Sequence, residues 1–114
     1  MASITPKQLI AAQQLTAAAV TYYTVPANVR AIIQKLTFTN VTAVARTVTV
    51  RFVVSGGTGS ATNTIAITKT IPAYDYWIGD VGQGHVLETG GFIEALSDSA
   101  ASVVILASGL EVAI

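Results

Sequence analysis

The sequence predicts an all-β protein, an antiparallel β-sandwich or jelly-roll-like fold of about eight strands that follows an N-terminal arm. Short segments rich in β-branched and aromatic residues recur along the chain, and several alternate apolar with polar residues, as half-buried strands do. Turn signals rich in Gly, Pro, Asn and Asp separate these segments at intervals of about eight to twelve residues. No stretch has the apolar spacing of a long amphipathic helix.

The composition indicates one domain whose surface is partly covered by neighbours. A chain of 114 residues can bury a core without a metal or a disulfide. It has no cysteine and a formal net charge of zero, which excludes disulfides, thiolate nucleophiles and a basic footprint for nucleic acid. Charged residues make up only 11%, so a monomer would be poorly protected against association. An ordinary β domain coated with Ser, Thr and Ala is the alternative.

The sequence shows neither a membrane-spanning run nor the pattern of a secretory signal. No apolar run approaches the roughly 18 residues that a transmembrane helix needs. Gln8, Gln13 and Gln14 interrupt the apolar residues near the start of the chain. We therefore expect neither a membrane span nor a secretory signal.

The first segment, residues 1–19, is ambiguous. Thr5 and Pro6 resemble a helix N-cap and its first helical residue, which would start a short helix; an extended arm ending in a strand near Gln13 is the alternative. The large apolar anchors after Met1 are Leu9, Ile10 and Leu15. Because so little burial cannot offset the backbone entropy, we favour an arm with at most one helical turn that orders against a partner. Its deletion should then leave the fold intact.

The sandwich domain, residues 20–114, opens with a strand, a turn and a longer strand. Tyr22 to Val25 suits a pleated, half-buried surface. Pro26 ends that strand because it cannot donate to a ladder, and Asn28 suits the bend. A period of two then sorts the longer strand into two faces, with Ile32, Leu36 and Phe38 toward the core and Ala31, Ile33, Lys35, Thr37 and Thr39 away from it.

The middle of the chain contains the strongest strand signal, Thr47 to Val54. Its alternation places Val48, Val50, Phe52 and Val54 on the core face. A Gly-rich loop at residues 55–60 leads to the next strand, Thr64 to Ile71, which Pro72 closes.

Shorter strands and a long closing strand complete the prediction. The short ones are Tyr74 to Ile78, His85 to Glu88 and Phe92 to Leu96. The closing strand, Ser102 to Ile114, contains Gly109, which marks a bulge or kink. Its predicted shared face consists of Val104, Leu106, Leu110, Val112 and Ile114.

Apolar residues also occupy the faces opposite the expected core. Several of them on adjoining strands would form a patch, and such patches mark interfaces. The candidate interface residues combine these positions, the anchors of the arm and the outward aromatic rings: Leu9, Ile10, Leu15, Tyr22, Ile33, Val53, Tyr74, Trp77, Val103 and Ile105. Core and sheet packing is the alternative use of the rings.

Residues that could carry chemistry form no recognised constellation. His85 is the single histidine, but no serine lies in a GxSxG turn. Asp75 and Asp80 flank an aromatic strand without the DxDxDG spacing of a cation loop. Glu88 and Glu94 could be pictured as a glycosidase pair, yet any β protein with six acidic residues contains such pairs. We expect no enzyme, no cofactor and no metal.

The order of the turn and strand motifs resembles that of small β-sandwich structural proteins of tailed bacteriophages. The stretches that match are YTVPANVRAIIQKLTFTN, RTVTVRFVVSGGTG and GGFIEALSDSAASVVILASGLEV, which together span residues 21–112. The matching positions are Tyr23, Val25 and Pro26 in the first turn, Gly91, Ile93, Ala95 and Leu96 in the second, and Gly109, Glu111 and Val112 in the last. Phe92 departs from the family, which often has a polar turn residue there, so this hairpin tip would make a different contact.

The resemblance implies a virion protein without catalytic residues, most often a capsid decoration (cement) protein that binds across shell subunits and stabilises the head. Its implied partners are the major capsid protein or other virion proteins and further copies of itself, with no nucleic acid and no membrane. It would be made in the cytoplasm of the bacterial host and lie in the virion. The alternative is a tail, collar or fibre module that binds a receptor or carbohydrate through Tyr74, Tyr76 and Trp77 with Asp75.

Overall fold

The computed structural model describes residues 4–59, 64–78 and 84–114, with the backbone alone for residues 64–68. Within these ranges the chain forms nine strands and no helix, so the prediction of an all-β fold is confirmed. The strands are β1 (Ile4–Gln14), β2 (Val20–Thr24), β3 (Val29–Asn40), β4 (Arg46–Val53), β5 (Thr64–Ile71), β6 (Tyr76–Ile78), β7 (Val86–Leu87), β8 (Phe92–Ser97) and β9 (Val103–Ala113).

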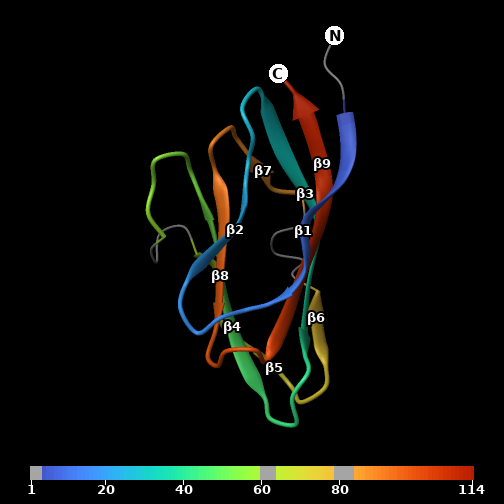
Figure 1. The fold of residues 1–114 in the computed structure, drawn as a ribbon, viewed down its shortest axis with the longest axis vertical. Helices are drawn as coiled ribbons and strands as arrows, with labels where there is room; N and C mark the ends of the chain where they lie inside the picture. The colour runs from blue at the N-terminus through green and yellow to red at the C-terminus, as the bar shows by residue number, and fades with distance from the viewer. Residues whose placement is uncertain (1–3, 60–63, 79–83) are drawn as a thin grey trace.

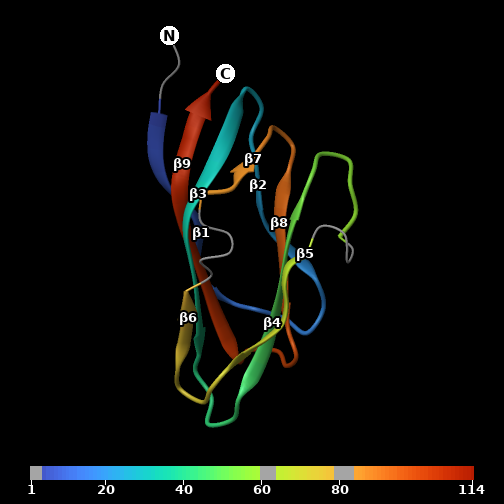
Figure 2. The same ribbon diagram turned by 180° about the vertical axis from the view of Figure 1, so that it is seen from behind.

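The strands form two antiparallel sheets that lie face to face (Figure 1). Sheet A has the order β1-β9-β3-β6, with β7 also paired to β3, and sheet B has the order β2-β8-β4-β5. The first half of the chain therefore pairs with the second half as one long hairpin, and this hairpin is rolled so that its strands alternate between the sheets. This is the jelly-roll arrangement. Figure 2 shows the β5–β6 connection crossing from one sheet to the other.

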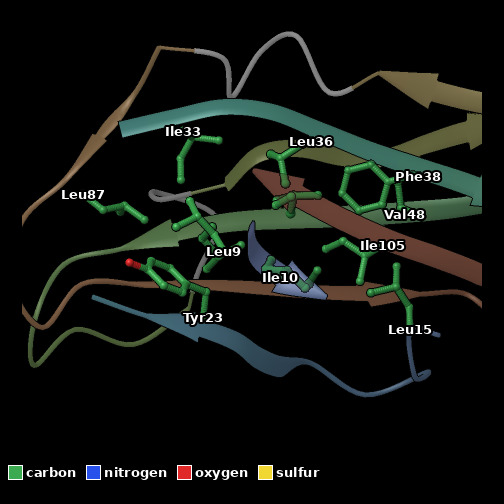
Figure 3. Packing of buried hydrophobic residues seen from close by; sticks show 14 of the residues in the cluster. Leu9, Ile10, Leu15, Tyr23, Ile33, Leu36, Phe38, Val48, Leu87 and Ile105 are labelled. Atoms are coloured by element: carbon green, nitrogen blue, oxygen red, sulfur yellow. The ribbon is translucent and has the colours of Figure 1, made fainter. Parts of the chain in front are cut away.

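The core fills the space between the two sheets, and each sheet supplies large apolar side chains to it (Figure 3). Those with less than 2% of their surface exposed include Ile10, Leu15, Ile33, Leu36, Phe38, Val48, Val50, Ile71, Ile93, Val103 and Ile105. Each such side chain contributes about 1.5–3 kcal/mol relative to an exposed position. The core therefore explains the stability of the sandwich without a disulfide or a metal.

The N-terminal segment is a strand of sheet A, which agrees with the extended alternative and not with a short helix that starts at Thr5 and Pro6. Residues Ile4–Gln14 pair with β9, and the Leu15 amide donates to the Val103 carbonyl at 2.8 Å. Leu9, Ile10 and Leu15 are at most 7% exposed. The few anchors are sufficient because β9 supplies hydrogen-bonding partners along β1 and the rest of the core surrounds the anchors. That residues 1–19 act as an arm separate from residues 20–114 stays a prediction.

A β-bulge at Gln34 reverses the faces of β3. Ile33 pairs with Gly109 and Lys35 pairs with Ser108, so Gln34 is the extra residue. Before the bulge Ile33 faces the core, and Ile32 lies on the outer face of sheet A. The strict period of two predicted the reverse, because one inserted residue moves every preceding side chain to the other face.

In β9 the core face is the one opposite to that predicted. Val103 and Ile105 are fully buried, whereas Val104 and Leu106 alternate with them on the outer face and are half-buried. Both faces of this strand are apolar, so periodicity alone could not choose between them. The position of β9 between β1 and β3 in sheet A decides the choice.

The end of β4 was also misassigned. Val54, which was expected in the core, is 74% exposed beyond the strand, whereas Val53 pairs with Phe92 on the outer side of sheet B and is fully buried there. The loop that follows β4 covers Val53: a Cβ atom added to Gly57 would lie 3.0 Å from Val53 Cγ1.

Candidate functional site

The outer face of sheet B is largely polar. Thr47 pairs with Thr70 across β4 and β5, and Arg51 pairs with Glu94 across β4 and β8. The Arg51 guanidinium donates to the Glu94 carboxylate at 2.9 Å. The apolar members of this face are the half-buried Phe92 and Leu96 and the fully buried Val53, which pairs with Phe92. Threonines and a paired charge make this face suitable for contact with water.

The outer face of sheet A is apolar over much of its area, and we call it the A face. Its members follow from the strand register, because residues paired across strands lie on the same side of a sheet. In β9, Leu110 lies between Pro6 of β1 and Ile32 of β3, and Val86 of β7 pairs with Ile32 on the far side. This row of the A face is apolar across every strand.

The A face continues to both ends of β9. At one end, Val112 lies between Ile4 and Arg30. Toward the other end, Leu106 pairs with Thr37, which pairs with Ile78. The last row consists of Gln14, Val104, Thr39 and Tyr76. The apolar residues therefore form two zones, one near each end of the face.

A polar row separates these two zones. Ser108 lies in the middle of β9, between Gln8 of β1 and Lys35 of β3. All three residues are exposed. The polar row lies where the β3 bulge begins, so the inserted Gln34 also sits at this level of the sheet.

The apolar members of the A face that lie on its edge strands are open to solvent. Ile4 is 63% exposed, Val86 49%, Ile78 41% and Tyr76 61%. Their β9 neighbours are half-buried by the sheet itself. Exposed apolar zones of this kind are uncommon on soluble monomers and mark interaction sites.

An aromatic turn lies at the end of the sandwich where β3 passes into β4. Tyr74 has a φ of 54° and is 73% exposed. Its amide donates to the Thr42 carbonyl at 3.0 Å. The buried Asn40 side chain ties the adjoining segments together, because its amide group donates to the carbonyls of Val44, Ile71 and Pro72. The ring of Tyr74 is therefore held outward on a firmly bonded turn.

The Trp77 side chain packs against the core and is not held out toward solvent. Its ring stacks on Phe38 with the centroids 5.4 Å apart, and Lys69 Nζ lies 5.5 Å from the Trp77 ring centroid. Such contacts stabilise a sheet edge. Of the rings considered for carbohydrate binding, only Tyr74 and Tyr76 are open to a ligand.

A polar cluster joins the two sheets near the end where β1 begins and β9 ends. The Tyr23 hydroxyl donates to Glu111 Oε2 at 2.6 Å, and Lys7 Nζ lies 3.3 Å from Glu111 Oε1. Burial, together with the hydrogen bond to Glu111, raises the pKa of the Tyr23 phenol well above its usual range. The cluster fastens β2 to β9 and β1, so its role is structural.

The predicted interface residues fall into four groups. The interior holds Leu9, Ile10, Leu15, Ile33, Val103 and Ile105, so the expectation that Ile33, Val103 and Ile105 face outward is wrong. Val53 lies on the outer side of sheet B, as expected, and is covered by the loop after β4. Tyr22 and Trp77 are half-buried against the core, and Tyr74 is exposed. The A face itself was missed, because Leu106 and Leu110 were assigned to the core. The apolar character of both faces of β9 was the signal that could have found it.

The residues considered for catalysis have ordinary contacts. Glu88 pairs with Arg30 at 3.2 Å, and Glu94 pairs with Arg51. His85 makes an edge contact with the Phe52 ring at 5.9 Å between centroids. Asp75 Oδ1 accepts from the Tyr76 amide. Asp80 lies outside the described residues.

No pocket, and no group of acidic, histidine or cysteine side chains that could hold a metal, occurs in the part of the chain that the structure describes. No helix in these same ranges is long and apolar enough to cross a membrane. That the protein is not an enzyme stays a prediction. The A face is accordingly the candidate site.

Solved structures share this architecture. A chain from the Bacillus endospore appendages, described as a family of disulfide-linked pili, is similar with a TM-score of 0.61 and 15% identity, over 100% of this chain and 91% of that one. A chain of infectious bursal disease virus, strain Gx, is similar with a TM-score of 0.56 and 12% identity, over 100% of this chain and 33% of that one. A chain of the T13 particle of the same virus gives a TM-score of 0.55 and 10% identity, over 99% and 31%.

The likeness is one of fold. At these identities it shows a shared jelly-roll sandwich, and this chain spans about a third of the length of the two virus chains. No protein-family model matches the sequence, and no curated protein is similar to it in sequence.

Proposed function

We propose that this chain is a structural subunit of a bacteriophage virion, a capsid decoration protein that stabilises the head. The observation that carries the proposal is the contrast between the two outer faces: the A face has two apolar zones with solvent-exposed members, whereas the outer face of sheet B has threonines and an ion pair beside apolar residues that are buried or half-buried. Interface centres are depleted in charge and enriched in large apolar groups. A soluble monomer has no use for such a face.

The fold supports the same proposal. Jelly-roll sandwiches of this kind occur in the particles of infectious bursal disease virus, and the motif order resembles that of tailed-phage structural proteins. Because β1 is built into sheet A, we assign the main contact to the A face rather than to an arm that reaches a further subunit. Many copies around a shell would make individually weak contacts persist, since each further contact is intramolecular.

The copy number of this chain in purified virions tests the proposal. Mass spectrometry against the major shell protein should find it in amounts comparable to the shell protein. A few to a few tens of copies would place it in the collar, tail or fibre instead. Absence from the particle would overturn a virion role.

A second candidate function is that of an appendage subunit. The likeness to the Bacillus endospore pilus chain covers 91% of that chain, so it concerns a whole subunit of comparable size. That family is described as disulfide-linked, whereas this chain has no cysteine. Filaments of this chain would therefore depend on surface contacts alone and should dissociate in denaturant without a reducing agent.

Receptor or carbohydrate binding by a tail or fibre module is favoured by one feature, the exposed Tyr74 and Tyr76 on the bonded turn. Aromatic faces with a nearby carboxylate such as Asp75 can hold a sugar ring. A glycan array tests this function: binding that is lost in Tyr74→Ala but kept in Trp77→Ala would support it. An array without binding would count against it.

A further inference from the structure

We propose that the A face binds the A face of a second copy, with the two β9 strands antiparallel across the interface. This inference rests on the proposed structural function and names the partner of its surface. It is carried by the order of residues on the outer side of β9, which is Val104, Leu106, Ser108, Leu110 and Val112. That order reads the same in both directions.

A two-fold axis that lies in the interface, perpendicular to β9 at the level of Ser108, makes such a strand complementary to its copy. It brings Leu106 of one copy against Leu110 of the other, Val104 against Val112, and Ser108 against Ser108. Closed dimers are the commonest oligomers, and their interfaces use the same patch on both copies. Binding to an unrelated partner would not require the order of residues on this face to be symmetric.

The symmetry extends to the outermost strands β6 and β7, while within β3 it places Ile32 opposite Thr37 and Arg30 opposite Thr39. Val86 and Ile78 pair with β3 on the same side, above and below the polar row, so the axis brings Val86 of one copy against Ile78 of the other. It also brings Arg30 toward Tyr76, an exposed ring that a guanidinium can cover. Apolar zone thus meets apolar zone, and the polar row meets itself.

The area suits a dimer contact. Val104 to Val112 spans about 30 Å and the strands of sheet A about 19 Å, from ~3.3 Å per residue and ~4.8 Å per strand, which gives a projected area of roughly 570 Å². The accessible surface of side chains exceeds their projection, so the face approaches the ~800 Å² per partner of a standard interface.

Face-to-face packing also agrees with the state of the sheet edges. The edge strand β1 carries two register shifts, with Pro6 and Lys7 near its start, and the edge strand β5 carries two more. Bulges, proline and lysine on edge strands oppose the addition of a further strand. These two edges are therefore protected against association, whereas the A face is not.

The position of Lys35 gives a specific test of the proposed dimer. This residue lies in the polar row on the axis, so the dimer brings two Lys35 side chains to the same level of the interface. Their four-carbon stems can carry the ammonium groups to the rim, but the like charges still oppose association. Lys35→Gln should therefore tighten the dimer at low salt, by roughly threefold to tenfold in Kd.

Sedimentation velocity of the purified full-length chain over a range of concentrations tests the proposal. Wild type should form a dimer, and Leu106→Lys should weaken it by at least about a hundredfold, because the symmetric contact buries the new charge twice. Thr70→Lys is the matched control on the outer face of sheet B and should leave the dimer unchanged. Circular dichroism confirms that both variants fold.

Crosslinking tests the register. Stacked sheets lie about 10 Å apart, beyond the reach of a disulfide, so a short bismaleimide is the reagent. Since the chain has no cysteine, Ser108→Cys provides a single reactive thiol and should crosslink to a covalent dimer. Thr70→Cys should not.

The outcomes separate this inference from the proposed function. A chain that stays monomeric at all concentrations yet is abundant in virions overturns the homotypic contact and leaves the virion role standing. A chain that dimerises through the A face but is absent from the particle overturns the virion role and leaves the homotypic contact standing. A dimer that Leu106→Lys and Thr70→Lys leave equally intact would place the contact elsewhere and overturn the inference.

Discussion

The hydroxyl of Tyr23 donates a 2.6 Å hydrogen bond to Glu111 Oε2 and so links β2 of sheet B to β9 of sheet A. Lys7, on β1, lies 3.3 Å from the other carboxylate oxygen. A half-buried carboxylate thus has both a neutral donor and a cation as partners. Charge-assisted hydrogen bonds of this kind are stronger than neutral ones, so the link holds the sheets together beyond their apolar contact.

This link makes stability depend on pH in the alkaline range. Because the pKa of Tyr23 is raised in the folded chain, the unfolded chain loses this proton first, near pH ~10. The contribution is therefore complete below about pH 10 and is lost progressively as pH rises above it, on the order of 1 kcal/mol by pH ~11. The free energy of unfolding in urea should therefore be lower at pH ~11 than below pH ~10. Tyr23→Phe should lose less between the same pH values, and Tyr76→Phe, an exposed control, should behave as wild type.

The N-terminal strand should be essential for folding. Removing residues 1–14 takes Leu9 and Ile10 out of the core and leaves one side of β9 without a partner. We expect this chain to lack a cooperative thermal transition. Ile10→Ala should cost about 2–5 kcal/mol, while the exposed Gln8→Ala should stay within about 0.5 kcal/mol. A truncated chain with wild-type stability would show that residues 1–19 are a separate arm after all.

Gly109 should not tolerate a side chain. A Cβ atom there would overlap the Ile32 carbonyl oxygen and lie 2.9 Å from Leu9 Cδ1. Since the first of these is backbone in the next strand, Gly109→Ala should destabilise the fold by about 1–3 kcal/mol or more in chemical denaturation. Ser108→Ala, one residue away and exposed, serves as the control. Equal stability of the two variants would contradict the close approach of β3 to β9.

Tyr74 should contribute to binding and not to the stability of the fold. A non-glycine residue in the left-handed region costs about 1–2 kcal/mol, and asparagine tolerates that region better. Tyr74→Asn should therefore raise the melting temperature while weakening any binding through the aromatic turn. Tyr76→Asn, within β6, should not stabilise. A Tyr74→Asn variant less stable than wild type would show that the ring contributes to packing.

Most strands could be read from the sequence, because β-branched alternation and Gly or Pro turns are local signals. Thr47 to Val54 was predicted within a residue of β4, and Thr64 to Ile71 coincides with β5. Prediction was poorest for β1, whose two core residues, Leu9 and Ile10, are an insufficient local signal. It also failed for the A face, since Val104 and Leu106 are as apolar as Val103 and Ile105.

The sequence by itself determined the fold class, most of the strands and most of the turns, because each depends on residues near one another in the chain. Only the tertiary structure decided which side of a strand faces the core. The Gln34 bulge and the place of β9 between β1 and β3 set those faces through pairing between distant segments. A one-residue shift in such pairing exchanges core for surface. The same pairing brings Pro6, Ile32, Val86 and Leu110 into one row, and so creates a surface that no local pattern contains.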